Sequence, residues 1–501
     1  MSGIPRPQTV RPSRLADLAA LISAELVGPD AEVSGVTHAS GEVHAGDLYA
    51  ALPGARRHGA EFAAAAAAAG AAAVLTDPAG RDAAVAAGLP VLVVADPRAV
   101  LGAAASRIYG DPTERLTVIG LTGTAGKTST AYLVESGLRA AGLTTGLIGT
   151  VETRLGDLVV QSVRTTPEAT DLHAILAAAL ERGVTAVVME VSSHALAMGW
   201  VGGVRFTVGG YTNFGLDHLD FHADAEDYFA AKARLFDGRC RFEVLNADEP
   251  ALAPLRKPAT ITYSAAGDRA ATWSAGDVAG DAFGQRFTAY GPAGPVRAGV
   301  ALPGRHNVAN ALLALSSLVA AGIDAQVAAD GIAACPGVPG RLERVDSPGD
   351  VFGVVDYAHK PDAIVAALAA LRDVGQGRLI CVIGAGGDRD RGKRPSMGEA
   401  AARGADVVVV TDDNPRTEDP GSIRAEVRAA AEAAAEAAVI EVAGRREAIT
   451  AAVRMSEPGD VVALLGKGHE RGQEVAGVTS PFDDRVELAA ALAARYAGVR
   501  L

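Results

Sequence analysis

A chain of 501 residues, 49% of them apolar, is long enough for three domains that each bury a core. Its net charge of -13 argues against binding to nucleic acid or to acidic lipid, because both need basic patches. Its three cysteines are far apart, which argues against a disulfide framework. No apolar signal segment is evident, and no apolar run approaches the roughly 20 residues of a membrane span. We therefore expect a soluble cytoplasmic protein without a membrane partner.

The first expected domain covers residues 1–112, where short strands alternate with helices. The alanine run at 62–69 predicts a helix, since alanine is the best helix former. Strands are predicted at 47–52, 72–77 and 91–96. Gly, Asp and Pro stand together in YGDPTERL, residues 109–116, which predicts a loop and the end of this domain.

The second expected domain covers residues 113–340. Strands are predicted at 116–123, 185–191 and 204–213, with helices between them, which is typical of a mostly parallel sheet. Residues 259–303 predict a β-rich insertion, and residues 307–322 predict a helix.

The third expected domain, residues 341–501, alternates more cleanly and predicts a Rossmann-like, doubly wound α/β fold. Its predicted strands are 351–359, 378–387, 406–414 and 460–468. The polar clusters DYAHKPD, GAGGDRDRGKR, TDDNPR and GKGHE lie at the ends of these strands, and ligands of such sheets gather outside the carboxyl ends. Taken singly, GAGGDR is a weak dinucleotide signal and DDNPR is a turn, but four successive clusters favour one shared site.

Residues 121–130, LTGTAGKTST, follow an apolar strand and open a helix at the lysine. Gly123 and Gly126 allow the backbone to approach phosphate oxygens, and amides at the helix start point at the anion. Lys127 can reach the outer phosphates, and the Thr128 hydroxyl can bind Mg²⁺. The general phosphate-loop template has glycine where this chain has Leu121, so an ordinary strand–helix turn is the alternative to ATP binding.

The second domain carries further candidates for metal chemistry. Glu190 ends a predicted strand and is well placed to hold Mg²⁺, which prefers oxygen ligands. The loop TNFGLDHLDFH, residues 212–222, could bind zinc, but it lacks a regular His-x₃-His spacing, and a second set of Mg²⁺ ligands is the favoured interpretation. Lys232 stands on an apolar helix, where a lysine by itself indicates a surface side chain. A Ser–His hydrolase is a poor interpretation of SSHAL, because adjacent residues do not supply nucleophile, base and orienter.

Ten segments in chain order resemble the Mur ligase family: TGTAGKTS, MEVSSHAL, DHLDFH, YFAAKARLF, GRHNVANALLAL, PGVPGRLERVD, VVDYAHKPD, GGDRDRGKRP, DDNPRTEDP and GKGHE. The resemblance covers essentially the whole chain and implies a central P-loop-type ATPase domain between a UDP-substrate domain and an amino-acid domain. It also implies an ATP-dependent amide ligase, in which ATP phosphorylates a substrate carboxylate and an amine attacks the acyl phosphate. A carboxylate is a poor electrophile, and phosphate supplies the leaving group.

The resemblance implies roles for residues of the ATP site. It places ATP at Gly123, Thr124, Ala125, Gly126, Lys127, Thr128, Ser129, Asn307, Arg341 and Asp356. The catalytic set it implies is Lys127, Glu190, His218 and Lys232. It makes Thr128, Glu190 and His218 ligands of Mg²⁺, joined by Lys232 as a carbamate, which overturns the interpretation of Lys232 as a surface lysine.

Within the family, the chain resembles the ligases that add meso-diaminopimelate to the D-Glu carboxylate of UDP-N-acetylmuramoyl-L-alanyl-D-glutamate in peptidoglycan synthesis. The implied diaminopimelate contacts are Arg389, Asp413, Asn414, Pro415, Arg416, Gly466 and Glu470. Diaminopimelate is lysine with a second carboxylate, to which the Arg416 guanidinium can donate two parallel hydrogen bonds. Asp413 and Glu470 would hold the distal ammonium. The implied contacts to the uridine nucleotide are His38, Ser40, Ala55, Arg56, Arg57, Thr165, Thr166, Ser193, Met198 and Trp200.

Several positions depart from the family pattern, and the segment YTNFGLDHLD, residues 211–220, differs from the usual FTNLSRDHLD. Ala125 replaces a polar residue of the loop, while Met198 and Trp200 stand where the family has Gln or a similar residue and then Arg, near the dipeptide. The alternative is therefore a paralogue that uses another carboxylate acceptor. A folylpolyglutamate-synthetase-like enzyme would leave DDNPR without a role, and the complete set of Lys127, Glu190, His218 and Lys232 argues against a non-catalytic scaffold. We expect a monomer that acts on small molecules.

Overall fold

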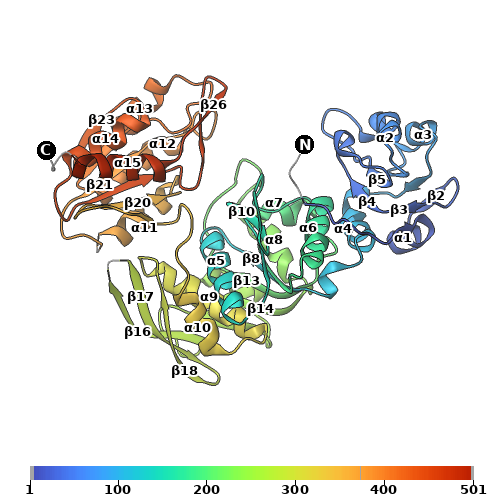
Figure 1. Cartoon of the computed structure of the whole chain (residues 1–501), viewed down its shortest axis with the longest axis horizontal. Coiled ribbons are helices and arrows are strands. Elements are labelled where there is room, and N and C mark those ends of the chain that lie inside the picture. The colour runs from blue at the N-terminus through green and yellow to red at the C-terminus, as the bar shows by residue number, and fades with distance from the viewer. Residues whose placement is uncertain (1–4, 282, 373, 498–501) are drawn as a thin grey trace. The chain divides into compact units, whose positions relative to one another are not determined.

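The computed structural model describes residues 5–281, 283–372 and 374–497 (Figure 1). The chain divides into two compact units. The first comprises Met1–Ser274, Tyr290–Val296 and Ala309–Ile332. The second comprises Ala275–Ala289, Arg297–Val308 and Ala333–Leu501. No helix among the described residues is long and apolar enough to cross a membrane.

The amino-terminal part of the first unit has a five-stranded sheet in the order β2-β7-β6-β5-β4. Its strands are β2 (Glu25–Val27), β7 (Val91–Val93), β6 (Ala73–Thr76), β5 (Asp47–Ala50) and β4 (Gly35–Thr37), and only β2 runs antiparallel to its neighbour. Its helices are α1 (Leu15–Ile22), α2 (Ala63–Ala68), α3 (Arg81–Ala86) and α4 (Pro97–Ile108), and β1 (Ser13–Arg14) pairs with β3 (Glu32–Val33). The three predicted strands and the alanine helix are confirmed.

The central sheet has eleven strands in the order β11-β10-β9-β12-β8-β13-β14-β15-β16-β17-β18. Its first eight strands in chain order are β8 (Thr117–Thr122), β9 (Thr145–Ile148), β10 (Glu152–Leu155), β11 (Leu158–Gln161), β12 (Ala186–Glu190), β13 (Phe206–Tyr211), β14 (Cys240–Asn246) and β15 (Ile261–Ser264). The helices that accompany them are α5 (Lys127–Ala140), α6 (Ala169–Glu181), α7 (Ser193–Ala197) and α8 (Ala225–Ala233). From β9 to β15 all neighbours are parallel, as predicted.

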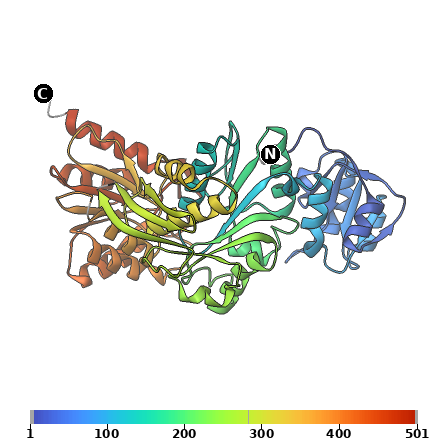
Figure 2. The same ribbon diagram turned by 90° about the horizontal axis from the view of Figure 1, so that it is seen from below.

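The predicted β-rich insertion forms β15 and three longer strands, drawn in yellow-green in Figure 2. These are β16 (Trp273–Asp281), β17 (Gly284–Gly291) and β18 (Gly294–Val300). They are followed by α9 (His306–Ala320), the predicted helix, and by α10 (Ala325–Ala333). The strands belong to the central sheet and carry residues of both compact units.

The second unit contains a six-stranded sheet in the order β19-β20-β24-β21-β22-β23, parallel except for β19. Its strands are β19 (Glu343–Val345), β20 (Phe352–Asp356), β24 (Val461–Leu465), β21 (Leu379–Ile383), β22 (Val407–Val410) and β23 (Ala438–Glu441). Its helices are α11 (Pro361–Leu371), α12 (Lys393–Gly404), α13 (Pro420–Ala434), α14 (Arg445–Met455) and α15 (Asp484–Ala497). The predicted strands are present but end earlier, because their polar carboxyl-terminal residues form loops.

Helices cover both faces of this sheet, which makes it doubly wound. Along β21, Cys381 and Ile383 belong to the core shared with α11, α12 and α13. Ile380 and Val382 alternate with them and belong to the core shared with α14 and α15. Since successive strand side chains point to opposite faces, a strand buried on both sides must be apolar throughout, as β21 and β24 are.

Candidate active site

The loop between β8 and α5 has the backbone geometry of a phosphate cradle. Gly123 and Gly126 have φ angles of 137° and 84°, which favour glycine. A Cβ atom at Gly123 would collide with the Thr212 side chain, and one at Gly126 would collide with Asn310. Helix α5 begins at Lys127, so its first amides face this loop and can bind an anion.

Thr128 and Glu190 meet at the start of α5. The Thr128 hydroxyl donates a hydrogen bond of 3.0 Å to Glu190 Oε2, and the Glu190 side chain is almost fully buried. Glu190 also accepts bonds from the Thr150 backbone N–H (2.7 Å) and hydroxyl (3.1 Å). Neighbouring oxygens around Mg²⁺ lie about 3 Å apart when the metal–oxygen bonds are about 2.1 Å long. The donor set of Thr128 and Glu190 therefore fits this ion.

Lys232 lies against the phosphate loop and is 1% exposed. Its Nζ donates to the Gly123 carbonyl at 2.8 Å and lies 4.6 Å from the centre of the Tyr228 ring. Lys127 Nζ donates to the same carbonyl at 2.6 Å and to Thr124 O at 3.1 Å. The structure thus brings two lysines from different helices to one carbonyl oxygen, and a surface position for Lys232 is wrong.

His218 belongs to an aromatic cluster near Lys232. Its ring centre lies 4.8 Å from that of His194 and 6.2 Å from that of Tyr228, and its Nε2 lies 3.2 Å from Asp217 Oδ2. Burial, followed by the charge of His222, lowers the pKa of His194. Among residues 5–281, 283–372 and 374–497, no three His, Cys, Asp or Glu side chains are grouped so that they could hold a metal ion. Of the predicted metal set, Thr128 and Glu190 are joined by a direct hydrogen bond.

Three predicted ATP contacts lie in the second unit, each in a defined environment. Asn307 Nδ2 donates to Pro303 O at 2.7 Å. The Arg341 guanidinium lies 4.6 Å from the centre of the Tyr357 ring. The Asp356 carboxylate accepts from the backbone N–H groups of residues 342 and 358, at 2.7 Å each, and burial raises its pKa.

The four polar clusters of the third sheet converge at the carboxyl ends of its strands. Asn414 Nδ2 donates to Glu470 Oε2 at 2.9 Å, which joins DDNPR to GKGHE. Arg416 Nη1 donates to Gly387 O at 2.6 Å, which joins DDNPR to the glycine loop after β21. The rings of Tyr357 and His469 lie 5.1 Å apart, which adds the loop after β20. The clusters therefore lie together at one edge of the sheet, which we take as the candidate amino-acid pocket.

Charges of both signs line this pocket. Gly466 has a φ of 113°, and a Cβ there would lie 2.6 Å from Asp413 Oδ2, so glycine lets the Asp413 carboxylate approach the backbone. Arg416 also has a positive φ, of 53°, and its Nε lies 3.5 Å from Glu474 Oε2. Arg389 is exposed, and its side chain has no hydrogen bond or ion pair with any residue that the structure describes. Carboxylates and guanidiniums side by side suit an amino acid, which carries both charges itself.

The predicted nucleotide-substrate residues fall into two groups. Thr165 and Thr166 adjoin the Glu190 site: the hydroxyl oxygens of Thr150 and Thr165 lie 3.1 Å apart, and Thr166 donates to the Glu190 carbonyl at 2.9 Å. His38 contacts Thr170 at 3.2 Å and Glu168 at 3.4 Å. Ser40 is half-buried, Ser193 is buried, and Ala55, Arg56 and Arg57 are exposed.

Trp200 lies beneath an arginine. The Arg164 guanidinium lies 5.1 Å from the centre of the Trp200 ring and also binds Glu168 at 2.5 Å. Trp200 Nε1 is buried, and no hydrogen-bond partner for it exists among the described residues. Arg205, the other cation near this point in the sequence, is exposed, and its backbone N–H binds Thr113. Of the two arginines, Arg164 is the one in contact with Trp200.

Sequence reasoning missed Thr150, Lys467 and Arg445. Thr150 supports Glu190 but stands in no motif, so no local signal could have found it. Lys467 lies within GKGHE, between the predicted site residues Gly466 and Glu470, but the sequence does not show that its side chain is buried. Arg445 forms a fully buried ion pair with Asp484 at 2.6 Å, and its neighbourhood in sequence has no motif.

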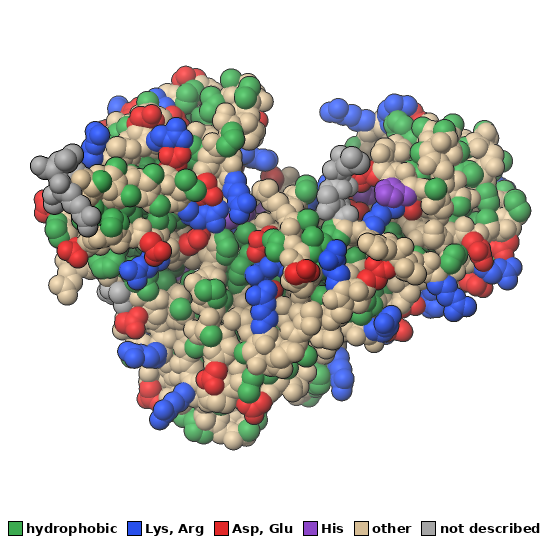
Figure 3. Space-filling view, in the orientation of Figure 1, with side chains coloured by type: hydrophobic (Ala, Val, Ile, Leu, Met, Phe, Trp, Pro, Cys, Tyr) green, Lys and Arg blue, Asp and Glu red, His purple; other side chains and the backbone are tan. Residues whose placement is uncertain are grey.

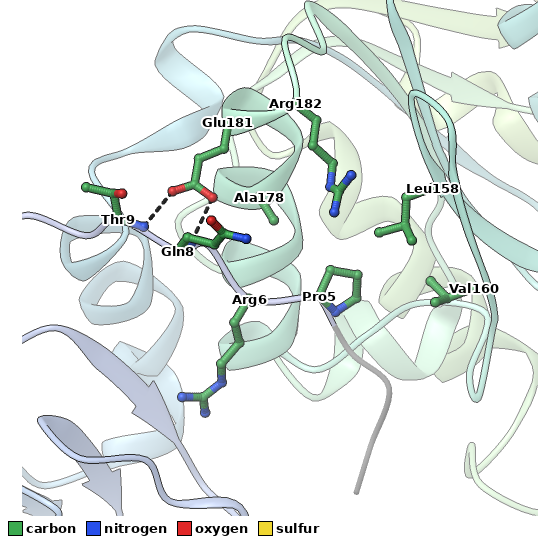
Figure 4. Close-up of a pocket in the computed structure, with 9 residues that line it drawn as sticks. All are labelled: Pro5, Arg6, Gln8, Thr9, Leu158, Val160, Ala178, Glu181 and Arg182. Atoms are coloured by element: carbon green, nitrogen blue, oxygen red, sulfur yellow. Dashed lines mark hydrogen bonds between the residues drawn. The ribbon is translucent and has the colours of Figure 1, made fainter.

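A cavity of about 710 Å³ in the first unit is lined by none of these residues (Figure 4). It is lined by Pro5, Arg6, Gln8, Thr9, Leu158, Val160, Ala178, Glu181 and Arg182. The Glu181 carboxylate already accepts the backbone N–H groups of Gln8 and Thr9, at 2.8 and 2.7 Å. We assign this cavity to the seam between the amino-terminal segment and α6. On the face drawn in Figure 3, acidic and basic side chains are interspersed.

Family models match the chain in three successive segments. They are the Mur ligase family catalytic domain over residues 32–109, the Mur ligase middle domain over residues 121–318, and the Mur ligase glutamate ligase domain over residues 340–468. A protein of Streptomyces coelicolor named UDP-N-acetylmuramoyl-L-alanyl-D-glutamate--2,6-diaminopimelate ligase is 53% identical, with 98% of each chain covered.

Two further relatives carry the same name. The protein of Corynebacterium glutamicum is 46% identical, with 89% of each chain covered. A solved structure is 32% identical, has a TM-score of 0.69 and covers 94% of this chain and 98% of its own. The chain belongs to the Mur ligase family.

Proposed function

We propose that this chain is an ATP-dependent ligase that joins meso-diaminopimelate to the D-Glu carboxylate of UDP-N-acetylmuramoyl-L-alanyl-D-glutamate, a step of peptidoglycan precursor synthesis. The observation that carries the proposal is the group of loops after the third sheet, where Arg389 and Arg416 lie beside Gly386, Asp413 lies beside Gly466, and Glu470 accepts a hydrogen bond from Asn414. An amino acid with a charged group of each sign at both ends matches these four side chains. Relatives that match 98% and 89% of the chain are named as ligases of UDP-N-acetylmuramoyl-L-alanyl-D-glutamate and 2,6-diaminopimelate.

The chemistry follows from the two sites. A carboxylate oxygen of the acceptor attacks the γ-phosphorus of ATP, ADP leaves, and an acyl phosphate forms. The amine then attacks the acyl carbon, and the tetrahedral intermediate expels phosphate and yields the amide. In this scheme Lys127 and the first amides of α5 hold the phosphates, so positioning and charge neutralisation supply most of the rate. Mg²⁺ held by Thr128 and Glu190 would neutralise phosphate charge.

We further propose that Lys232 works as a carbamate. Lys232 and Lys127 donate to one carbonyl oxygen at 2.8 and 2.6 Å, so the two Nζ atoms are about 5.4 Å apart at most. Two ammonium groups this close repel each other. Attack of the neutral Lys232 amine on CO₂ forms an N–C bond and releases a proton, which replaces one cation with an anion. The carbamate would offer an oxygen on the side of the loop where His218 and Tyr228 lie.

The acceptor remains a UDP-linked dipeptide in this proposal despite Trp200. The contact that supports it is Arg164, which lies on the Trp200 ring and can supply the positive charge that tryptophan lacks. We assign residues 1–112 to the nucleotide substrate, 113–340 to ATP and 341–501 to the amino acid. The substrates are small molecules, and we place the enzyme in the cytoplasm as a monomer.

The test is ligation by the purified chain with ATP, Mg²⁺, UDP-N-acetylmuramoyl-L-alanyl-D-glutamate and a panel of amines. We expect ADP release that needs both the nucleotide and meso-diaminopimelate, with a product mass equal to the two substrates joined with loss of water. Activity with another carboxylate and none with this nucleotide would favour the paralogue instead.

A further inference from the structure

Lys467 is a buried lysine directly behind the amino-acid pocket. Its side chain is 0% exposed, and it follows Gly466 at the carboxyl end of β24. Its Nζ donates to Asn414 Oδ1 at 3.0 Å and to Glu470 Oε2 at 3.1 Å. A buried lysine is retained where its charge is paired, and here both partners belong to the pocket.

The contacts of Lys467 determine how Asn414 is oriented. Asn414 Oδ1 accepts from Lys467 and also from the Glu474 backbone N–H, at 3.0 Å each. These two donors occupy both lone pairs of the amide oxygen, so the oxygen cannot be exchanged with the amide nitrogen. The nitrogen must then point to Glu470, to which it donates at 2.9 Å. Asn414 is thereby held as a donor to Glu470.

The same contacts leave one oxygen of Glu470 for a ligand. Oε2 accepts from both Asn414 and Lys467, whereas Oε1 accepts no hydrogen bond from any residue in the described ranges. The Glu470 side chain is 34% exposed, so part of it is open to a ligand. Burial raises the pKa of Tyr357, and the nearby charges of Glu470 and Asp413 raise it further.

We propose that Lys467 is a positioning residue for the amino-acid substrate, because it clamps Asn414 and Glu470 so that Glu470 Oε1 faces the pocket and receives the substrate ammonium. This inference rests on the proposed function and deepens it. Without Lys467, Asn414 Oδ1 keeps only the Glu474 backbone N–H as a donor, and Glu470 Oε2 loses one of its two donors. The incoming amino acid would then have to order the pocket itself and would bind less tightly.

The test is a double-mutant cycle on steady-state kinetics. We expect Lys467→Met to raise the KM for meso-diaminopimelate about tenfold to a hundredfold, the range for a lost charged hydrogen bond, while the KM values for ATP and the nucleotide change less than about twofold. Glu470→Gln should raise the same KM. In the Glu470→Gln background Lys467→Met should add less than about twofold, because the residue acts through Glu470. Lys467→Arg, which keeps the charge, should recover part of the affinity.

A matched variant separates positioning from loss of stability. Arg378 pairs with the buried carboxylate of Asp460 at 2.8 Å, at the amino ends of β21 and β24, away from the pocket. Arg378→Met should lower the melting temperature without raising the KM for diaminopimelate. If Lys467→Met does not fold, Lys467→Gln, which keeps a donor and lacks the charge, replaces it. An unchanged KM in the folded Lys467 variant, or additive effects in the cycle, overturns the inference, whereas a wild type that never uses diaminopimelate overturns the proposed function.

Discussion

Removing the Arg416 guanidinium should separate diaminopimelate from lysine as substrates. Arg416 stands in DDNPR with a φ of 53° and a side chain that is 23% exposed. Arg416→Ala leaves the backbone strain in place, because alanine is also strained at positive φ, so the variant reports mainly the lost side chain. Lysine lacks the second carboxylate that this side chain would bind, so its poor use should hardly change.

The size of the effect follows from the contacts of Arg416. Truncating one partner of a buried charge pair costs about 2–5 kcal/mol. Nη1 already donates to Gly387 O at 2.6 Å, and Glu474 offsets part of the charge at 3.5 Å, so we expect the lower part of this range. A cost of about 2–3 kcal/mol is a loss of roughly 30- to 160-fold in kcat/KM for diaminopimelate.

The assay is ADP release with each amine in turn, for wild type and variant. Arg403→Ala is the matched control, because Arg403 lies on α12 of the same unit, is 60% exposed and pairs with Glu399 four residues away. The control should keep the wild-type preference. Equal use of lysine and diaminopimelate by the wild type would refute the reasoning, as would an Arg416→Ala loss that is the same for both amines.

Three further predictions address other parts of the chain. Lys232→Ala should nearly abolish turnover and recover partly with acetate or formate, which can replace the carbamate; full activity without a rescuer would contradict the carbamate. Arg164→Ala should raise the KM for the nucleotide substrate sharply and Arg205→Ala should not, whereas a nearly inactive wild type that Trp200→Arg activates at least tenfold would favour the paralogue. Burial lowers the pKa of His173 to about 4, so the folded chain holds it neutral while the unfolded chain protonates it near pH 6.5. Lowering the pH from 7 to 5 should therefore reduce the free energy of unfolding of the wild type by about 2 kcal/mol more than that of His173→Gln, as measured by denaturant unfolding at both pH values. Equal losses in the two proteins would contradict this.

The sequence by itself determined the local parts of this protein. The β8–loop–α5 unit was predicted because an apolar run, two glycines and a helix start are adjacent along the chain. The strands β20, β21, β22 and β24 were predicted because strands buried on both faces are continuously apolar. Their polar ends could be assigned to one edge because parallel strands end together. The family resemblance named most of the pocket residues for the same reason, since motifs are short and contiguous.

Only the tertiary structure decided which side chains meet. Lys467 and Asn414 are 53 residues apart, and Thr150 and Glu190 are 40 apart, so their hydrogen bonds leave no local pattern. Lys232 looks like a surface lysine along its helix, and its burial depends on the packing of α8 against a loop 109 residues earlier in the chain. Arg164 reaches Trp200 only because the chain folds back between them. The free energy of a buried charge depends on the partners that the fold brings to it, and those partners come from other elements.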